Sequence, residues 1–372
     1  MLFAVHTRGM RKELISSTQV FALATIFLLG SWIILTPSSR ITKQDAWIGS
    51  LLLGLPACGY ALLLSAVKDL YPGENLIGLS RKAFGQRIGS ILAVFWLWFP
   101  LHLAALVLNN LTSLLMYQIY PTASAITLSL PLIIVIAYSA ALGPEVIARF
   151  ALILLPLIIA GLLAIYGLAI PLFDAHHLFP LLEASTGDFL RQGLAGFSFP
   201  FAEMILLFPF LAHAPKDRSL LRPLLSAVIL STLLFALRDM IAIAVFGQAE
   251  VDTLLFPLFS VVLHEELGIF LDRLDVAFIP VFFFSSLIKG MICFYSFIEH
   301  LTDWLGAKER SLLIPPAALL TVGLSLFVYE HLLDVFDFAN KAYALYLLPW
   351  ALGFPLGALI LRYRKKVKPS QS

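Results

Sequence analysis

The chain is a succession of long apolar segments separated by short polar ones. A membrane-spanning helix needs about 20 mostly apolar residues, and we interpret ten segments as spans. They cover residues 15–36, 46–67, 88–117, 124–142, 147–170, 192–212, 221–246, 275–298, 312–329 and 342–361. No polar stretch is long enough to fold separately, which predicts a single transmembrane domain over residues 1–372.

The positions of the cations orient these helices. Loops on the cytoplasmic side of a membrane carry an excess of Lys and Arg. With the N-terminus in the cytoplasm, 18 of the 25 Lys and Arg residues fall on the inner side and five on the outer side. One span fewer would invert every later loop, so the pattern predicts about ten spans with both termini cytoplasmic.

Composition supports this interpretation and excludes several functions. Hydrophobic residues make up 60% of the chain and charged residues 13%, whereas soluble domains carry roughly 25% charged residues. The net charge is only +2, and no basic surface interleaved with aromatic residues points to nucleic acid.

No pattern typical of an enzyme, metal site or cofactor site is found. A Gly-rich phosphate loop, HExxH, CxxC and G-x-S-x-G are all absent, and His176-His177 has no further ligand residues nearby. Cys58 and Cys293 lie inside apolar segments as small buried residues. We therefore expect no enzymatic activity, no cofactor and no metal. The first apolar segment can serve as an uncleaved span, whether translation starts at Met1 or at Met10.

Two predicted helices contain potential breaks. Leu29-Gly30-Ser31-Trp32 interrupts the first, and Gly193, Gly196, Ser198 and Pro200 cluster in the sixth. Gly and Pro weaken the helical hydrogen-bond ladder, and freed backbone groups persist in a membrane only where they meet other protein or line a cavity.

The positions of these breaks suggest an internal repeat. Helices one and six open two five-helix halves, about 15–170 and 190–361, followed by a basic tail at 362–372. Because five is odd, the second half enters the membrane from the opposite side. Interrupted helices at matching positions of inverted repeats indicate a solute site near the middle of the membrane.

Glu203 and Lys289 are charged residues well inside spans six and eight. An ionised carboxylate such as Glu203 costs about 2.5–3.5 kcal/mol at mid-bilayer even on insertion scales. It could be a proton or cation site, a partner for a ligand ammonium, or a structural carboxyl at the N-terminus of the second half-helix. Lys289 could neutralise a carboxylate, replace a coupling cation, or extend to the inner surface.

Uncharged polar residues also fall within the spans. One face of helix three carries three polar residues, His102, Asn109 and Asn110. They could line a path for water or ions, or they could form hydrogen bonds between helices. Ser285 could bind a ligand or a carbonyl of its own helix, as could its neighbour Ser286. Arg238 and Asp239 suggest a structural pair near the outer interface.

Five stretches resemble a known family. They are Ile15-Ser-Ser-Thr-Gln19, Gln44-Asp-Ala-Trp-Ile48, Gly143-Pro-Glu-Val-Ile-Ala-Arg149, Phe197-Ser-Phe-Pro-Phe-Ala-Glu203 and Phe270-Leu-Asp-Arg-Leu-Asp275. Their order and spacing along the whole chain resemble the B subunits of spore germinant receptors (GerAB-type spore permeases). These belong to the amino acid–polyamine–organocation transporter superfamily, and Lys289 also matches a lysine that the family usually carries.

This resemblance implies an all-α, LeuT-like membrane protein that binds a small germinant, such as a free amino acid, between helices one and six. It implies A-type and C-type receptor subunits as partners in the inner membrane of the spore, with ion release as the output. The implied ligand-binding residues are Gly30, Ser31, Trp32, His102, Phe197, Ser198, Phe199 and Ser285, with Glu203 and Lys289 as coupling charges.

Two alternatives stay open at this point. One is a stand-alone amino acid permease coupled to protons or cations. The other is an ion-conducting subunit that is gated by its ligand.

Overall fold

The computed structural model describes residues 15–31, 38–214, 219–254, 257, 260, 275–328, 338–339 and 341–367. Regular structure within these ranges is helical, with no strand. The main helices are α1 (Ser17–Leu29), α3 (Ala46–Leu70), α4 (Leu76–Phe84), α5 (Gln86–Gln118), α6 (Ala125–Leu142), α7 (Pro144–Ala169), α8 (Thr186–Ser198), α10 (Leu221–Val251), α13 (Asp275–Leu305), α14 (Ile314–Phe327), α16 (Tyr343–Ala351) and α17 (Gly353–Val367). Shorter elements are α2 (Ser39–Thr42), η1 (Lys43–Asp45), η4 (Phe201–Leu207) and α9 (Phe208–Leu211).

Most of the predicted spans are present as long apolar helices. Within the described ranges, nine helices are long and apolar enough to cross a membrane, and they correspond to predicted spans two to ten. The first span is represented by the shorter apolar helix α1, which stops before the undescribed residues 32–37. The total of ten spans and the cytoplasmic placement of the termini therefore stay predictions.

The outer surface is suited to lipid. Large apolar side chains are exposed on different helices, among them Leu55 of α3, Ile91 of α5, Ile153 of α7 and Leu319 of α14. Exposed apolar surface spread over this many helices is typical of a protein whose solvent is the bilayer. The chain is an integral membrane protein.

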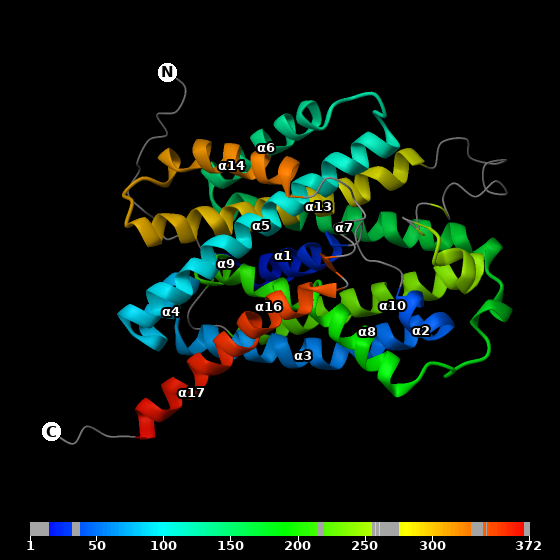
Figure 1. Cartoon of the computed structure of the whole chain (residues 1–372), viewed down its shortest axis with the longest axis horizontal. Coiled ribbons are helices and arrows are strands. Elements are labelled where there is room, and N and C mark those ends of the chain that lie inside the picture. The colour runs from blue at the N-terminus through cyan, green and yellow to red at the C-terminus, as the bar shows by residue number, and fades with distance from the viewer. Residues whose placement is uncertain are drawn as a thin grey trace.

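Helix α1 lies at the centre of the bundle (Figure 1). It packs against α7, α10, α13 and η4, and every side chain from Val20 to Leu29 except Phe21 is buried. Its start is fixed by a capping box, in which the Ser16 side chain accepts from the Gln19 N–H and Gln19 Oε1 accepts from the Ser16 N–H. This reciprocal arrangement satisfies backbone donors that would otherwise be unpaired, which explains the Ser-Ser-Thr-Gln sequence that precedes the span.

Both predicted helix breaks are confirmed. Helix α1 ends at Leu29, and Gly30 and Ser31 follow as a turn. In the sixth span, α8 ends at Ser198 and Phe199 is extended, with φ −133° and ψ 110°. The chain then continues as the 3₁₀ segment η4 and the short helix α9.

The break in the sixth span is narrower than the sequence indicated. Gly193 and Gly196 both lie inside α8, so they do not interrupt it. A Cβ at Gly196 would lie 2.6 Å from Leu53 Cδ2, whereas one at Gly193 would meet no atom within 4 Å. Gly196 therefore serves close packing of α8 on α3, and the interruption is confined to Phe199 and Pro200.

A loop anchor positions the start of α8. The buried carboxylate of Asp45 accepts hydrogen bonds from the Leu182 N–H at 2.7 Å and the Ala184 N–H at 2.9 Å. Gln44 Nε2 donates to the Pro180 carbonyl and to Glu183 Oε2, both at 2.8 Å. The Gln-Asp pair before α3 therefore fixes the loop from which α8 begins.

A buried polar network then ties α8 to its neighbours. Gln192 of α8 accepts from Thr42 Oγ1 at 2.6 Å and donates to Ser50 Oγ of α3 at 3.3 Å. Ser50 donates in turn to Asp239 of α10 at 2.6 Å, and Asp239 is ion-paired with Arg238. Arg238 and Asp239 thus form the structural pair expected from the sequence, and both side chains are buried.

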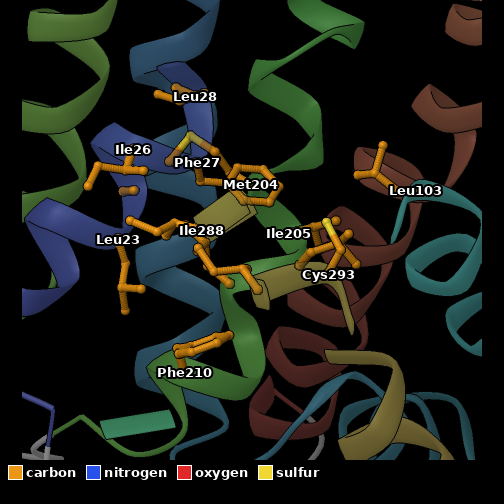
Figure 2. Close-up of a cluster of buried hydrophobic side chains, with 14 of the residues drawn as sticks. Leu23, Ile26, Phe27, Leu28, Leu103, Met204, Ile205, Phe210, Ile288 and Cys293 are labelled. Atoms are coloured by element: carbon orange, nitrogen blue, oxygen red, sulfur yellow. The ribbon is translucent and has the colours of Figure 1, made fainter. Parts of the chain in front are cut away.

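The apolar core joins the segments around the two breaks. Figure 2 shows Leu23, Ile26, Phe27 and Leu28 of α1 beside Met204 and Ile205 of η4, Phe210 of α9, and Ile288 and Cys293 of α13. All nine side chains belong to one buried cluster. The two broken helices and α13 are therefore packed around one centre.

Candidate functional site

An ion pair lies where the two broken helices meet. Glu203, in η4, and Lys289, in the middle of α13, are 0% and 1% exposed, and Lys289 Nζ lies 2.5 Å from Glu203 Oε2. Each charge is compensated by the other. This is the arrangement that the low dielectric of the protein interior requires.

Further side chains complete a small charged cluster. The Tyr343 hydroxyl of α16 donates to Glu203 Oε1, and Lys289 Nζ also donates to the Ser31 hydroxyl at the break of α1. The ammonium lies 4.9 Å from the ring centroid of Phe27 and 5.1 Å from that of Phe199, within the range of cation–π attraction. We call this set the Lys289 cluster: Phe27, Ser31, Phe199, Glu203, Lys289 and Tyr343.

The close approach of α13 to α1 explains why a glycine occupies the first break. A Cβ at Gly30 would lie 2.6 Å from the Ser285 carbonyl oxygen and 2.8 Å from Lys289 Cβ. Ser286 Oγ donates to the Gly30 carbonyl at 3.0 Å, so α13 satisfies a backbone group freed by the end of α1. Residues four apart lie on one face of a helix, so the face of α13 that carries Ser285 also directs Lys289 at the break.

The second break places Glu203. Helix α8 stops at Ser198, and the turn through Phe199 and Pro200 starts η4, which buries Glu203 in its first turn. Phe199 therefore reaches the ammonium from the break itself, and Glu203 reaches it one turn later. The sequence between Phe199 and Glu203 delivers both an aromatic face and a carboxylate to one cation.

The cluster can bind charge. It offers one ammonium, one carboxylate, two hydroxyls and two aromatic faces to an ionic ligand or a proton. Within the described ranges, no group of three or more His, Cys, Asp or Glu side chains could hold a metal ion.

Four predicted site residues belong to the cluster: Ser31, Phe199, Glu203 and Lys289. Gly30 adjoins it, and Trp32 lies outside the described residues.

The remaining residues predicted near the breaks make local contacts. Phe197 packs edge-on against Tyr60, with ring centroids 5.5 Å apart. Ser198 Oγ donates to the Ala195 carbonyl and Ser285 Oγ to the Phe282 carbonyl. Both hydroxyls therefore bond within their own helices, and Ser286 rather than Ser285 reaches the first break.

His102 is separated from the cluster by aromatic side chains. Its Nδ1 is 3.2 Å from the Tyr346 hydroxyl, and its ring packs on Phe338 and Tyr346. Phe338 and Tyr346 both contact the ring of Tyr343. His102 is therefore connected to Glu203 through Tyr343 and its aromatic neighbours, not by direct contact.

The two asparagines of α5 differ from each other. Asn109 Nδ2 donates to the Ser325 carbonyl of α14 at 2.7 Å, which is the interhelical hydrogen bond expected for a polar residue in a span. Asn110 is buried, and its side-chain amide has no hydrogen-bond partner in the part of the chain that the structure describes. The two side chains therefore differ in their contacts, and their role in a water or ion path stays a prediction.

The sequence did not indicate two members of the cluster. Phe27 and Tyr343 are aromatic residues within predicted spans one and ten, and neither carries a charge that would mark it as part of a polar site. A buried tyrosine hydroxyl usually has a hydrogen-bond partner, so a partner for Tyr343 could be expected. The sequence pattern did not identify Glu203 as that partner.

Comparisons with known proteins agree with the sequence and the geometry. Residues 14–331 match the family model described as "Spore germination protein". The chain is 27% identical over 376 residues to spore germination protein KB of Bacillus subtilis (strain 168), covering 98% of each chain. It is 21% identical over 353 residues to spore germination protein A2 of the same organism, covering 91% of this chain and 94% of that protein.

The fold also matches a solved structure. The crystal structure of MhsT in complex with L-phenylalanine superposes with a TM-score of 0.71 at 13% sequence identity, covering 93% of this chain and 87% of that one. The predicted all-α, LeuT-like fold is thereby confirmed, whereas its division into two five-helix halves stays a prediction.

Proposed function

Because the chain belongs to the spore germination protein family, whose model matches residues 14–331, we propose that it is the membrane-embedded B subunit of a spore germinant receptor. In this role it binds a small germinant, an amino acid, between its two broken helices. It works with A-type and C-type subunits in the inner membrane of the spore and helps to trigger ion release. It is a binding protein and not an enzyme.

The Lys289 cluster is the observation that carries this proposal. Interrupted helices at matching positions of inverted repeats are where solutes bind in this class of fold, and the breaks after Leu29 and Ser198 meet at one buried ion pair. The relatives in Bacillus subtilis are named as spore germination proteins, and the solved structure with the same fold holds L-phenylalanine.

The proposal is tested in spores that lack the native gene and carry a variant instead. Ser31→Trp and Phe199→Trp place a large ring at the first and second break, where both native side chains are buried. We expect germination in response to amino acids to be lost, with the protein present at its normal level in the spore membrane.

Matched variants carry the same new side chain elsewhere. Leu55→Trp and Ile153→Trp add tryptophan at apolar positions that are 74% and 72% exposed, and their spores should germinate normally. Normal germination of the Ser31→Trp and Phe199→Trp spores, with intact protein, would reject the binding site between the breaks.

A second function has a specific observation in its favour. The fold shared with the L-phenylalanine complex and a buried carboxylate beside a lysine also suit an amino acid permease coupled to protons. The two functions differ in turnover, since a receptor needs binding alone whereas a permease must release its solute on the other side of the membrane.

A further inference from the structure

We propose that the ligand binds by separating Lys289 from Glu203 and exchanging partners with both. The ligand carboxylate pairs with the Lys289 ammonium, and the ligand ammonium pairs with the Glu203 carboxylate. This inference rests on the proposed function and specifies its ligand as a zwitterion, with both charges recognised by side chains.

The two charges belong to separate elements and can therefore move apart. Lys289 lies on α13, which packs closely against the first break at Gly30. Glu203 lies on η4, which follows the second break at Phe199. A small displacement of η4 relative to α13 would open a gap between the charges without unfolding either element.

Each charge keeps its own support when the pair is separated. The ammonium is held by the Ser31 hydroxyl and the rings of Phe27 and Phe199. The carboxylate is held through its other oxygen, Oε1, by the Tyr343 hydroxyl. The ion pair uses Oε2, so the contact that is broken is distinct from the contacts that keep both groups oriented.

Charge balance determines which ligands can do this. The pair is buried and neutral in total, and removing the partner of a buried charge is strongly unfavourable. A zwitterion supplies one charge of each sign, so Lys289 and Glu203 both remain compensated. A simple carboxylate would leave Glu203 without a cation, and a simple amine would leave Lys289 without an anion.

The first experiment uses the purified full-length protein. Each of the twenty proteinogenic L-amino acids is tested for binding by calorimetry. For every amino acid that binds, the amine lacking its carboxylate and the acid lacking its ammonium are compared. For L-alanine these are ethylamine and propionate, and for L-phenylalanine they are phenethylamine and 3-phenylpropionate. We expect both analogues to bind at least about 30-fold more weakly than the amino acid, because each leaves one buried charge unpaired.

The second experiment removes the charges one at a time. Glu203→Gln leaves a lone ammonium, so the acid analogue should bind as tightly as the amino acid or more tightly. Lys289→Met leaves a lone carboxylate, so the amine analogue should bind as tightly as the amino acid or more tightly. The double variant should lose the preference for the amino acid over both analogues, since the protein then offers no charge of either sign to compensate those of the ligand.

Matched controls make the same substitutions in an exposed ion pair. Lys82 Nζ and Glu74 Oε1 are also 2.5 Å apart, with the Lys82 side chain 61% exposed. Lys82→Met and Glu74→Gln should leave the ligand ranking unchanged. Gel filtration and thermal unfolding establish whether each variant is folded. If a single variant does not fold, the partner exchange is tested by the ligand ranking of the wild type and by the double variant.

The outcomes separate the two proposals. Failure of the wild type to bind any amino acid would reject the proposed function itself. Binding of an amino acid with analogues of equal affinity, or a ranking that Glu203→Gln and Lys289→Met leave unchanged, would overturn the partner exchange and leave the receptor function standing.

Discussion

Gly30 has no side chain, and the backbone of α13 lies where one would be. A Cβ there would be 2.6 Å from the Ser285 carbonyl oxygen, closer than van der Waals contact allows. Overpacking of this kind typically costs about 1–3 kcal/mol. We therefore expect Gly30→Ala to lower the midpoint of thermal unfolding of the purified protein by several degrees, because α1 and α13 must separate at the break.

The chain offers a control for this substitution within another span. Gly323 lies in α14, and a Cβ built there meets no atom within 4 Å. Gly323→Ala should leave the unfolding midpoint unchanged or raise it slightly, since alanine favours helix over glycine. Equal midpoints for Gly30→Ala and the wild type would show that the contact between Gly30 and α13 is not tight.

Some residues of the candidate site could be predicted from the sequence, and others could not. Glu203 and Lys289 were identifiable because a charge inside a span is costly and must be compensated. Tyr343 was not, because its partner Glu203 is 140 residues away and only the packing of α16 against η4 brings them together. His102 and Ser285 were assigned to the ligand site by family resemblance, which does not give the direction of a side chain. The direction of a side chain around a helix decides its contacts, and apolar spans carry little periodicity from which to read that direction.

At the level of elements, the loop before α8 controls how the second broken helix is held. Asp45 accepts from two backbone N–H groups of this loop and is buried. Hydrogen bonds to a charged group contribute about 1.5–3 kcal/mol each. We expect Asp45→Ala to lower the unfolding midpoint and to increase hydrogen exchange at the amides of Leu182 and Ala184.

A neighbouring aspartate provides the comparison. Asp174 Oδ1 accepts from the His176 N–H in an exposed turn, so Asp174→Ala should lower the midpoint by less than half as much. If Asp45→Ala left exchange at residues 182 and 184 unchanged, the loop would be held by other contacts.

The elements themselves were more predictable than the contacts between them. Long apolar segments bounded by charges located the nine helices that, within the described residues, are long and apolar enough to cross a membrane. The thickness of a membrane fixes their length. The break at Phe199 and Pro200 was expected, but Gly193 and Gly196 were wrongly included in it. Glycine permits either a break or close helix packing, and sequence alone does not distinguish the two. Leu53, on another helix, settled the role of Gly196.

For the whole molecule, the ion pair is the contact that the proposed ligand would replace. Lys289 and Glu203 compensate each other, and a bound zwitterion would replace that contact with two new ones. A ligand can shift an equilibrium between two conformations only by its difference in affinity for them. Under the proposed partner exchange, the paired and the ligand-bound arrangements would be the two conformations whose difference in affinity drives the response.

Uptake measurements distinguish the proposed sensor from a permease. The protein is reconstituted into liposomes, and a radiolabelled amino acid that binds the purified protein is added outside with an inward proton gradient. We expect binding that saturates at about one ligand per protein, with no accumulation beyond it, because partner exchange at a buried pair needs no passage to the other side. Liposomes without protein, and proteoliposomes in which an ionophore has abolished the gradient, supply the baselines. Accumulation that depends on the gradient and disappears in Glu203→Gln would instead establish a proton-coupled permease, with the same cluster carrying the proton.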